Sequence, residues 1–281
     1  MESQKKFPRV FSCEYFPPKD DDARTRLRDT TRELATLKPK YFSVTFGAGG
    51  STRDGTYDTV QEIHAQGHSV APHLSCIGST RAELRSLLAA YRALGINRLV
   101  ALRGDQPKDG AVRSELRYAN ELVEFIRAET GDHFHIEVAA YPEVHPEAPS
   151  PDADLENFRR KIEAGANAAV TQYFFNADAY YRFVDACAAK GLNVPIVPGI
   201  MPITNYKQLA RFSDACGAEI PRWIRKRLEG FGDDLDSLRA FGLDVTTELC
   251  AKLLAAGAPG LHFYTMNRAN PTRRIWQQLG L

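Results

Sequence analysis

The sequence predicts an α/β fold, a single (β/α)8 TIM barrel with extra helices before the last strand. Eight short strand-like runs alternate with amphipathic helical stretches from one end of the chain to the other. This alternation predicts a parallel sheet, and eight strands can close into a barrel filled by side chains. Neither a low-complexity linker nor an internal repeat divides the chain, so we expect one domain over residues 1–281. An open doubly wound sheet is the alternative fold.

The predicted strands are rich in β-branched and aromatic residues and are bounded by Gly, Pro or Asn. They cover residues 10–16, 41–46, 69–76, 98–104, 135–141, 168–175, 194–200 and 261–265. Successive strands are separated by one helical stretch each, except before the last strand. That longer gap contains helical segments near 204–216, 221–229 and 243–256, which are the extra helices.

Helical periodicity is clearest between the early strands. Residues 80–94 place Leu84, Leu87, Leu88 and Tyr91 on one face at helical spacing, and residues 21–37 are also amphipathic. Several helices begin near a side chain that can accept from unpaired backbone N–H groups, for which we expect Asp54, Thr80 and Asp152.

Charge and composition exclude several classes of protein. Lys and Arg total 36 and Asp and Glu total 35, so the net charge is +1. A nearly neutral protein has no overall positive potential that would attract nucleic acid or an anionic membrane. No apolar run approaches the roughly 20 residues of a membrane span. Because Glu14 interrupts the amino-terminal segment, we expect no signal peptide and a cytoplasmic protein. Five cysteines without a CxxC pair indicate reduced thiols.

Polar residues gather where the predicted strands end, which is where barrel enzymes place their active sites. No lysine ends a strand, which disfavours a Schiff-base aldolase. HExxH and GxxxxGK[ST] are absent, and GAGGST (47–52) is not the dinucleotide-binding GxGxxG. The glycines of that loop are explained equally well by a tight turn and by the close approach of a ligand to the backbone. His133 and His135 open the fifth strand, at the wrong end for catalysis, and predict no metal site.

Glu14 is the most informative of these residues because it lies among aromatic side chains and ends the first strand. Burial of a carboxylate there should raise its pKa, and a carboxylic acid with a raised pKa can donate a proton near neutral pH. The alternative is a structural ion pair between Glu14 and a neighbouring arginine.

A second candidate site follows the fifth strand. Asn157, Arg160 and Lys161 are spaced at i, i+3 and i+4, so they share a helix face, with Asp154 one turn earlier. Two cations and an amide suit a diphosphate. The alternative is an exposed ladder of ion pairs with Asp154. The cluster RWIRKR (222–227) is interpreted as a solvated face around Trp223.

These segments together resemble the methylenetetrahydrofolate reductase family over nearly the whole chain. The matching stretches are CEYFPPK (13–19), VTFGAGGSTRDGT (44–56), PHLSCIG (72–78), ALRGDQP (101–107), AAYPEVHPEA (139–148), KIEAGANAAVTQYFF (161–175), PGIMPITNYKQLARF (198–212) and LHFYTMNRAN (261–270). Their order along the chain makes the set specific, although each stretch alone would be modest.

The resemblance implies a TIM barrel that binds FAD without a Rossmann motif and reduces 5,10-methylenetetrahydrofolate to 5-methyltetrahydrofolate. NADH or NADPH would reduce the flavin and leave, and folate would then take the hydride in a ping-pong scheme. Glu14 would be the general acid. Asp105 would lie near the N1–C2 edge of the flavin and favour hydride donation.

The remaining roles also come from the resemblance. FAD would be bound by Thr45, His73, Arg103, Gly104, Asp105, Tyr141, His145, Asp154, Asn157, Arg160 and Lys161. Folate and nicotinamide would face Glu14, Gln172, Gln208, Phe212, Tyr264 and Arg268, with Phe212 as the stacking residue.

The family resemblance further implies a homo-oligomer without a metal and with small-molecule substrates only. Because the chain ends at Leu281, just past the last predicted helix, we expect no regulatory domain and no inhibition by S-adenosylmethionine. Two alternatives stay open. One is a flavin- or folate-binding subunit that works only inside an electron-transfer complex, and the other is a pterin-binding methyltransferase barrel.

Overall fold

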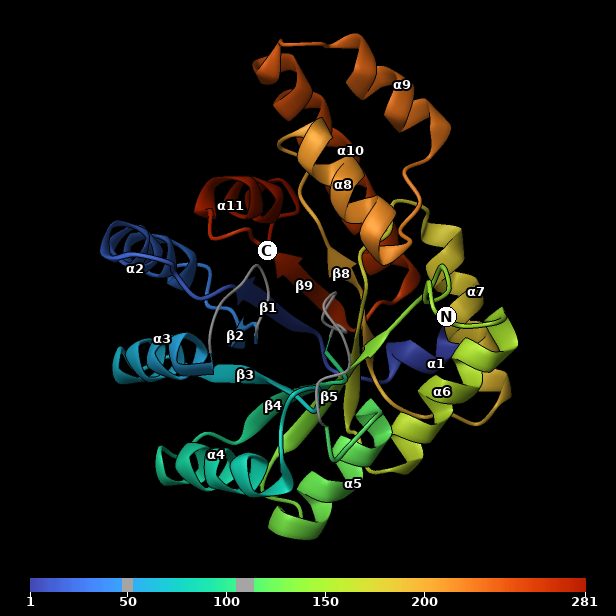
Figure 1. Ribbon diagram of the computed structural model, residues 1–281. Coiled ribbons are helices and arrows are strands. Elements are labelled where there is room, and N and C mark those ends of the chain that lie inside the picture. The colour runs from blue at the N-terminus through green and yellow to red at the C-terminus, as the bar shows by residue number, and fades with distance from the viewer. Residues whose placement is uncertain (47–52, 105–113) are drawn as a thin grey trace.

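The computed structural model describes residues 1–46, 53–104 and 114–281, with the side chains of Arg53 and Asp54 left out. Its strands are all parallel and form a nearly closed barrel surrounded by helices (Figure 1). The strand segments are β1 (Val10–Tyr15), β2 (Tyr41–Val44), β3 (Val70–Ser75), β4 (Arg98–Leu102), β5 (His135–Ala140), β6 (Ala168–Thr171), β7 (Ile196–Val197), β8 (Gly199–Ile200) and β9 (Gly260–Tyr264). The TIM-barrel prediction is confirmed.

The seventh predicted strand, residues 194–200, is divided into two short segments at Pro198. β7 pairs with β6, and β8 pairs with β9, so together they occupy one strand position and bring the barrel to eight. Proline has no N–H to donate to a ladder, which explains the interruption. Its carbonyl still accepts from the backbone N–H of His262 at 3.0 Å. β1 pairs with β2 and β9, so the first and last strands lie side by side.

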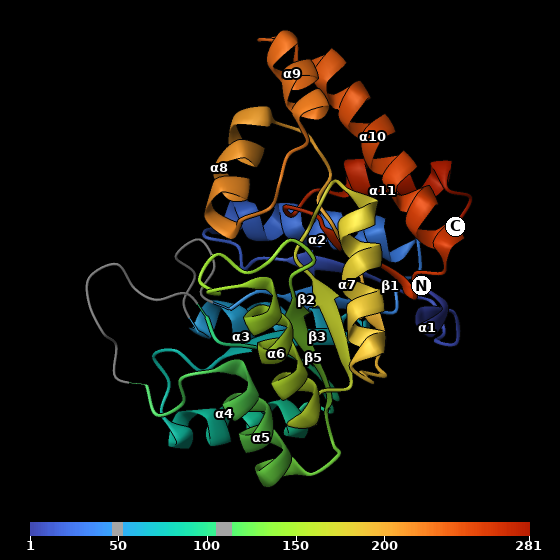
Figure 2. The same cartoon turned by 90° about the vertical axis from the view of Figure 1, so that its right-hand side faces the viewer.

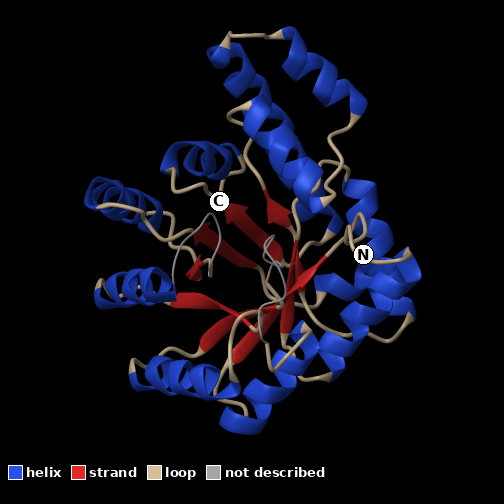
Figure 3. Cartoon of the chain, viewed as in Figure 1, coloured by secondary structure: helices blue, strands red, loops and turns tan. Residues whose placement is uncertain are grey.

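Helices cover the outside of the barrel (Figure 3). They are α1 (Glu2–Lys5), α2 (Asp21–Ala35), α3 (Arg53–Ala65), α4 (Arg81–Ala93), α5 (Ala119–Thr130), α6 (Pro151–Glu163), α7 (Ala177–Ala189), α8 (Tyr206–Cys216), α9 (Arg222–Gly230), α10 (Leu235–Ala256) and α11 (Ala269–Gln278). The extra helices before the last strand are therefore present, although α10 begins eight residues earlier than predicted. α8, α9 and α10 project together from one side of the barrel (Figure 2).

Two of the three predicted helix caps can be compared with the structure. Thr80 forms a reciprocal capping box with Glu83, as expected. The cap of α6 is Ser150, whose side chain accepts from the backbone N–H of Ala153 at 3.2 Å. The prediction of Asp152 was wrong because Pro151 already occupies the first helical turn, so the cap lies one residue before it. The side chain of Asp54 lies outside the described residues.

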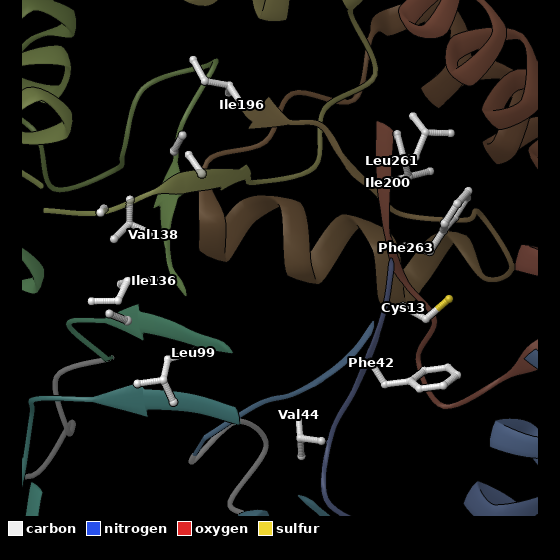
Figure 4. Close-up of a cluster of buried hydrophobic side chains, with 14 of the residues drawn as sticks. Cys13, Phe42, Val44, Leu99, Ile136, Val138, Ile196, Ile200, Leu261 and Phe263 are labelled. Atoms are coloured by element: carbon white, nitrogen blue, oxygen red, sulfur yellow. The ribbon is translucent and has the colours of Figure 1, made fainter. Parts of the chain in front are cut away.

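Alternation along the strands separates two environments. Cys13, Phe42, Leu99, Ile136 and Phe263 belong to the main apolar cluster between strands and helices (Figure 4). Since side chains alternate along a strand, their neighbours in sequence face the barrel interior. On β1, β2, β5 and β9 those neighbours are polar: Ser12, Glu14, Tyr41, Ser43, Glu137, His262 and Tyr264. The barrel interior is therefore unusually polar along these strands.

The extra helices pack against the barrel through a second apolar cluster. Ile203, Leu209, Ile224 and Leu238 are buried there together with Tyr173 from the segment after β6. Among the described helices, none combines the length and apolar character needed to cross a bilayer. All five cysteines are free thiols.

Candidate active site

Glu14 lies at the carboxyl end of β1 between two imidazoles. Its Oε2 is 3.2 Å from Nε2 of His73 on β3 and 3.3 Å from Nε2 of His262 on β9. The contact with His262 is a hydrogen bond, whereas His73 Nε2 is close to the carboxylate without the alignment of one. Glu14 is 17% exposed and both imidazoles are buried. The alternative of an ion pair with an arginine is wrong, because histidines hold the carboxylate instead.

The predicted raised pKa of Glu14 is also wrong. Burial raises the pKa as expected, but His73 and His262 together outweigh it and lower the pKa of Glu14 to about 2. The sequence argument counted aromatic neighbours along the chain and missed the two imidazoles that parallel pairing brings from other strands.

Further contacts fix the position of this carboxylate. Ser12 Oγ lies 2.7 Å from Nδ1 of His262, on the side of the ring opposite Glu14. The hydroxyl of Thr265 donates to the backbone carbonyl of Glu14 at 2.6 Å. Tyr264 donates to the carbonyl of Thr171 at 2.7 Å, so its ring is held beside the same pocket. Sequence reasoning missed Ser12 and His262, although polar residues alternating with Cys13 and Phe263 were a signal.

On β4 and β5, charged groups follow the strand ends. Arg103 makes a bidentate ion pair with Glu147 at 2.5 and 2.8 Å. The backbone N–H of His145 donates to Asp154 at 2.9 Å, and the rings of Tyr141 and His145 meet edge to face at 4.5 Å. These contacts connect the segment after β5 to α6.

Gly104 is required by the backbone at the end of β4. Its φ is +89°, a conformation that side chains disfavour. A Cβ atom there would lie 2.0 Å from Oγ of Ser75. Any side chain at this position would therefore collide with Ser75.

The charged face of α6 divides into an inner and an outer part. Lys161 donates to the carbonyl of Ala139 at 2.5 Å, and burial lowers its pKa to about 8. Arg160 is exposed and lies 3.5 Å from Glu156, while Asn157 is exposed as well. The alternative of an exposed ladder of ion pairs is therefore correct only in part. Arg160 does form an exposed ion pair, with Glu156, but Asp154 accepts from the backbone N–H of His145 instead of pairing with a cation. Lys161 is a buried ammonium whose hydrogen-bond partner is a neutral carbonyl.

The opposite side of the site is formed by β6, β9 and α8. Gln172 directly follows β6, and its side-chain oxygen accepts from the backbone N–H of Tyr173 at 3.0 Å. Gln208 and Phe212 are one turn apart on α8, and Phe212 packs on the second apolar cluster. Arg268 is exposed at the start of α11 and lines a cavity of about 450 Å³ between α2, α10 and α11.

Two parts of the predicted site cannot be placed. Asp105, expected beside the flavin, and the loop GAGGST (47–52) lie outside the described residues. All other predicted site residues belong to strand ends or to the segments and helices that follow them, so the topology brings them to one end of the barrel.

Unpartnered polar atoms indicate where a ligand fits. Oγ1 of Thr45 and Nε2 of His73 are buried without a hydrogen-bond partner among the described residues. A buried polar atom without a hydrogen bond is costly, which a polar ligand at the Thr45 hydroxyl would relieve, whereas His73 Nε2 already lies 3.2 Å from the Glu14 carboxylate. Together with the Lys161 ammonium, they fit a group that carries both heteroaromatic and anionic parts, as FAD does.

No set of three or more metal-ligating side chains occurs in the part of the chain that the structure describes. His133 and His135 lie at the amino end of β5, away from Glu14.

The fold and site define a (β/α)8-barrel protein in which a glutamate and two histidines from different strands form a buried acid–imidazole group. The sequence model of the methylenetetrahydrofolate reductase family matches residues 2–280. The chain therefore belongs to the methylenetetrahydrofolate reductase family.

Individual relatives agree with this assignment. The 5,10-methylenetetrahydrofolate reductases of Pectobacterium carotovorum and Escherichia coli are each 42% identical over 271 residues, which cover 96% of this chain and 90% of theirs. A probable methylenetetrahydrofolate reductase (NADH) of Oryza sativa is 37% identical over 97% of this chain and 48% of its own length.

A solved structure from Clostridium thermocellum, described as binding two copies of 5-methyl-5,6,7,8-tetrahydrofolic acid, has a TM-score of 0.68 at 15% identity. The match covers 99% of this chain and 96% of the other. At that identity the likeness shows the fold alone.

Proposed function

We propose that this chain reduces 5,10-methylenetetrahydrofolate to 5-methyltetrahydrofolate with electrons from NADH or NADPH, through bound FAD, and with Glu14 as the general acid. The observation that carries the proposal is the buried group of Glu14, His73 and His262, which β1, β3 and β9 bring together. Family membership supplies the substrate, and the site supplies the proton chemistry.

The reaction needs a hydride and a proton at different atoms of the folate. When bound, FAD would accept the hydride from the nicotinamide nucleotide and hold it until the folate replaces that nucleotide in the site. The protein must deliver a proton to the folate amine nitrogen as the imidazolidine ring opens to the iminium. Glu14 is the carboxyl group at the end of β1 that can carry this proton.

The low pKa of Glu14 is compatible with that role. Because His73 and His262 lower the pKa of Glu14, its carboxyl is ionised at neutral pH and must take up a proton before it can act as an acid. A bound substrate excludes water and increases the burial of Glu14, which favours its neutral form. The proton can then pass from imidazole to carboxyl and on to the amine.

Binding of FAD would use the residues at the ends of β2 to β5 and on α6. The Lys161 ammonium would neutralise a diphosphate charge, and the Thr45 hydroxyl and His73 imidazole would gain the partners that they lack. Arg103 and Asp154 would contribute through the segments that they hold in place. The protein binds and orients the cofactor with these groups.

Folate and nicotinamide would bind between the cofactor and α8. The Phe212 ring is half-buried on α8, and a flat face there can stack on either substrate in turn. Gln172 directly follows β6, Tyr264 ends β9 and donates to the carbonyl of Thr171, and both side chains can orient polar edges of the pterin.

The test is a visible absorption spectrum of the purified chain under anaerobic conditions. NADH is added first, because the Oryza relative is named for it, and NADPH is tested in parallel. The proposal predicts a flavin spectrum that bleaches with nucleotide and recovers with methylenetetrahydrofolate. Bound flavin that neither nucleotide bleaches would point to an electron-donating partner protein. A chain that binds no added FAD would overturn the flavin part of the proposal.

A further inference from the structure

A buried hydrogen bond joins α8 to the segment that follows β6. The hydroxyl oxygens of Tyr173 and Ser213 are 3.0 Å apart, and each residue is 3% exposed. The Tyr173 ring is packed among the side chains of the second apolar cluster. A hydroxyl without a partner would be costly in such surroundings, and here the two hydroxyls satisfy each other.

Ser213 occupies a position where the pattern of α8 favours an apolar residue. Tyr206, Leu209 and Cys216 lie at helical spacing from it on the face that packs against the second apolar cluster. Leu209 and Ser213 are the two buried residues of this helix. A serine buries little apolar surface there and adds a hydroxyl that must find a partner. What Ser213 contributes at this position is therefore its bond to Tyr173.

Each residue of the bond is next in sequence to a predicted substrate residue. Gln172 immediately precedes Tyr173, and Phe212 immediately precedes Ser213. The backbone N–H of Tyr173 also donates to the side-chain oxygen of Gln172 at 3.0 Å. The amide nitrogen of Gln172, which is a donor only, is then the end of that side chain left for a ligand. Tyr173 thus holds the Gln172 amide through its N–H and holds α8 through its hydroxyl.

The ring of Tyr173 is also fixed against the barrel. It meets the ring of Tyr264 on β9 edge to face, with centres 6.4 Å apart. Tyr264 in turn meets His262 edge to face at 5.3 Å, and His262 contacts Glu14. These are favourable geometries for aromatic pairs. Tyr173 is therefore an anchor on the barrel side, close to the acid–imidazole group.

Other hydrogen bonds hold the ends of α8. Tyr206, its first residue, donates to Glu229 at 3.1 Å and so joins α8 to α9 and not to the barrel. After its last residue, the backbone N–H of Glu219 donates to Glu143 in the segment after β5 at 2.8 Å. The bond made by Ser213 acts between these two points, directly beside the predicted stacking residue.

We propose that the Tyr173–Ser213 hydrogen bond sets the spacing between α8 and the end of β6, and that both are positioning residues for the substrate slot between Gln172 and Phe212. A flat ring that stacks on Phe212 while it accepts from the Gln172 amide needs one fixed spacing of the two side chains. Folate and nicotinamide would use the slot in turn, so loss of the bond should weaken the binding of both. The identity of these substrates rests on the proposed function.

The first test measures amide hydrogen exchange of α8 by mass spectrometry, on the full chain without substrates. Tyr173→Phe and Ser213→Ala should each speed exchange within residues 206–216 roughly fivefold, the size expected for one neutral hydrogen bond. The double variant should exchange no faster than the faster single variant, because both substitutions remove the same bond. Unchanged exchange in both single variants, or additive effects in the double variant, would overturn the inference.

Tyr180→Phe is the matched control, because Tyr180 is also fully buried and donates to the carbonyl of Ile196 at 2.7 Å. This variant loses a similar bond away from the slot and should leave both the exchange of α8 and the KM values unchanged. A rise in KM as large as that of Tyr173→Phe would mean that general destabilisation, and not the slot, governs binding.

Steady-state kinetics test the effect on the substrates. Tyr173→Phe should raise KM for methylenetetrahydrofolate and for the nicotinamide nucleotide roughly fivefold each, with kcat within about twofold of the wild type. Unchanged KM values, or a fall in kcat alone, would contradict the positioning role. If the wild type reduces no methylenetetrahydrofolate, the proposed function fails, while hydrogen exchange still decides whether this bond holds α8.

Discussion

The two ends of the barrel treat polar groups differently. At the amino end, Glu137 is held by Arg98 and by Tyr41, and both of its oxygens have partners. At the carboxyl end, Glu14 shares one oxygen with two imidazoles, and the Thr45 hydroxyl nearby has no partner among the described residues. At the amino end both oxygens of the Glu137 carboxylate are therefore hydrogen-bonded within the protein. At the carboxyl end a polar group is left that can hydrogen-bond to a ligand.

A polar cavity of about 520 Å³ lies at the amino ends of β4 and β5 and is lined by Arg98, Arg127 and His135. Its cations are already engaged: Arg127 donates to the carbonyl of Gly165 and to the side chain of Asn167. This cavity therefore differs from the carboxyl end of the barrel, where the Thr45 hydroxyl has no hydrogen-bond partner among the described residues.

The largest expected effect on stability is at the amino end. Arg98→Met leaves the Glu137 carboxylate buried without its cation, and breaking a buried pair in this way costs about 3–5 kcal/mol. Chemical denaturation should show this loss in the free energy of unfolding. Arg85→Met is the control, because Arg85 and Glu129 form a bidentate pair at the surface. Such pairs contribute about 1 kcal/mol or less. Equal losses would contradict the contrast between buried and exposed pairs.

At the carboxyl end, Lys161→Met should affect ligand binding more than any exposed cation of α6 does. Losing a charge-assisted contact of about 1.5–3 kcal/mol raises the FAD dissociation constant roughly 10- to 100-fold. Arg160→Ala should weaken binding less, since that side chain is exposed. Arg159→Ala, whose guanidinium is bound by Glu156 and Glu163, is the control and should leave the constant unchanged. Flavin fluorescence titration measures all three.

Acid should destabilise the carboxyl end through Glu14. The folded-state pKa is lowered to about 2, below the unfolded value, so Glu14 contributes stability above about pH 4.5 and loses it as the pH falls toward 2. The full contribution is on the order of 3 kcal/mol, since the pKa falls from 4.5 to about 2 and one pKa unit corresponds to about 1.4 kcal/mol. Denaturation of wild type and Glu14→Gln at pH 6 and pH 3 should show a steeper loss in the wild type. Parallel losses would mean that the imidazoles do not hold the carboxylate.

The smallest effects concern two buried hydroxyls outside the site. Tyr180 donates to the carbonyl of Ile196 at 2.7 Å, whereas the Tyr91 hydroxyl has no partner among the described residues. Tyr180→Phe should lower the free energy of unfolding by about 1 kcal/mol, and Tyr91→Phe should raise it by a similar amount. Thermal melts of both variants compare them directly. A loss in both would indicate that Tyr91 has a partner in the folded protein.

The fold was predictable because its signals are local. Each strand run is bounded by turn residues, and the strands are separated by amphipathic helices, so the count of eight was readable from the chain. The division of the seventh strand at Pro198 was also visible in principle, since proline interrupts a ladder. The start of α10 at Leu235 was harder to predict from the sequence. Its first turns pack against α8 and α9 in the second apolar cluster, and not against a strand of the barrel.

The site was predictable only in part, because its chemistry depends on pairing between distant strands. Glu14 could be chosen from its place at a strand end, but its neighbours His73 and His262 come from β3 and β9. Their charge reverses the expected direction of its pKa shift. Ser12 and Tyr41 are unremarkable in sequence and gain meaning only from the register that places them side by side.

The central claim is that the carboxyl end of the barrel delivers a proton through Glu14 to the folate. The most direct test is rapid-mixing absorbance of Glu14→Gln with its two half-reactions measured separately. The account predicts normal FAD binding and normal flavin reduction by the nicotinamide nucleotide, with reoxidation by methylenetetrahydrofolate slowed about 10²- to 10⁴-fold. Reoxidation within a few-fold of the wild-type rate, or equal loss of both half-reactions, would contradict it.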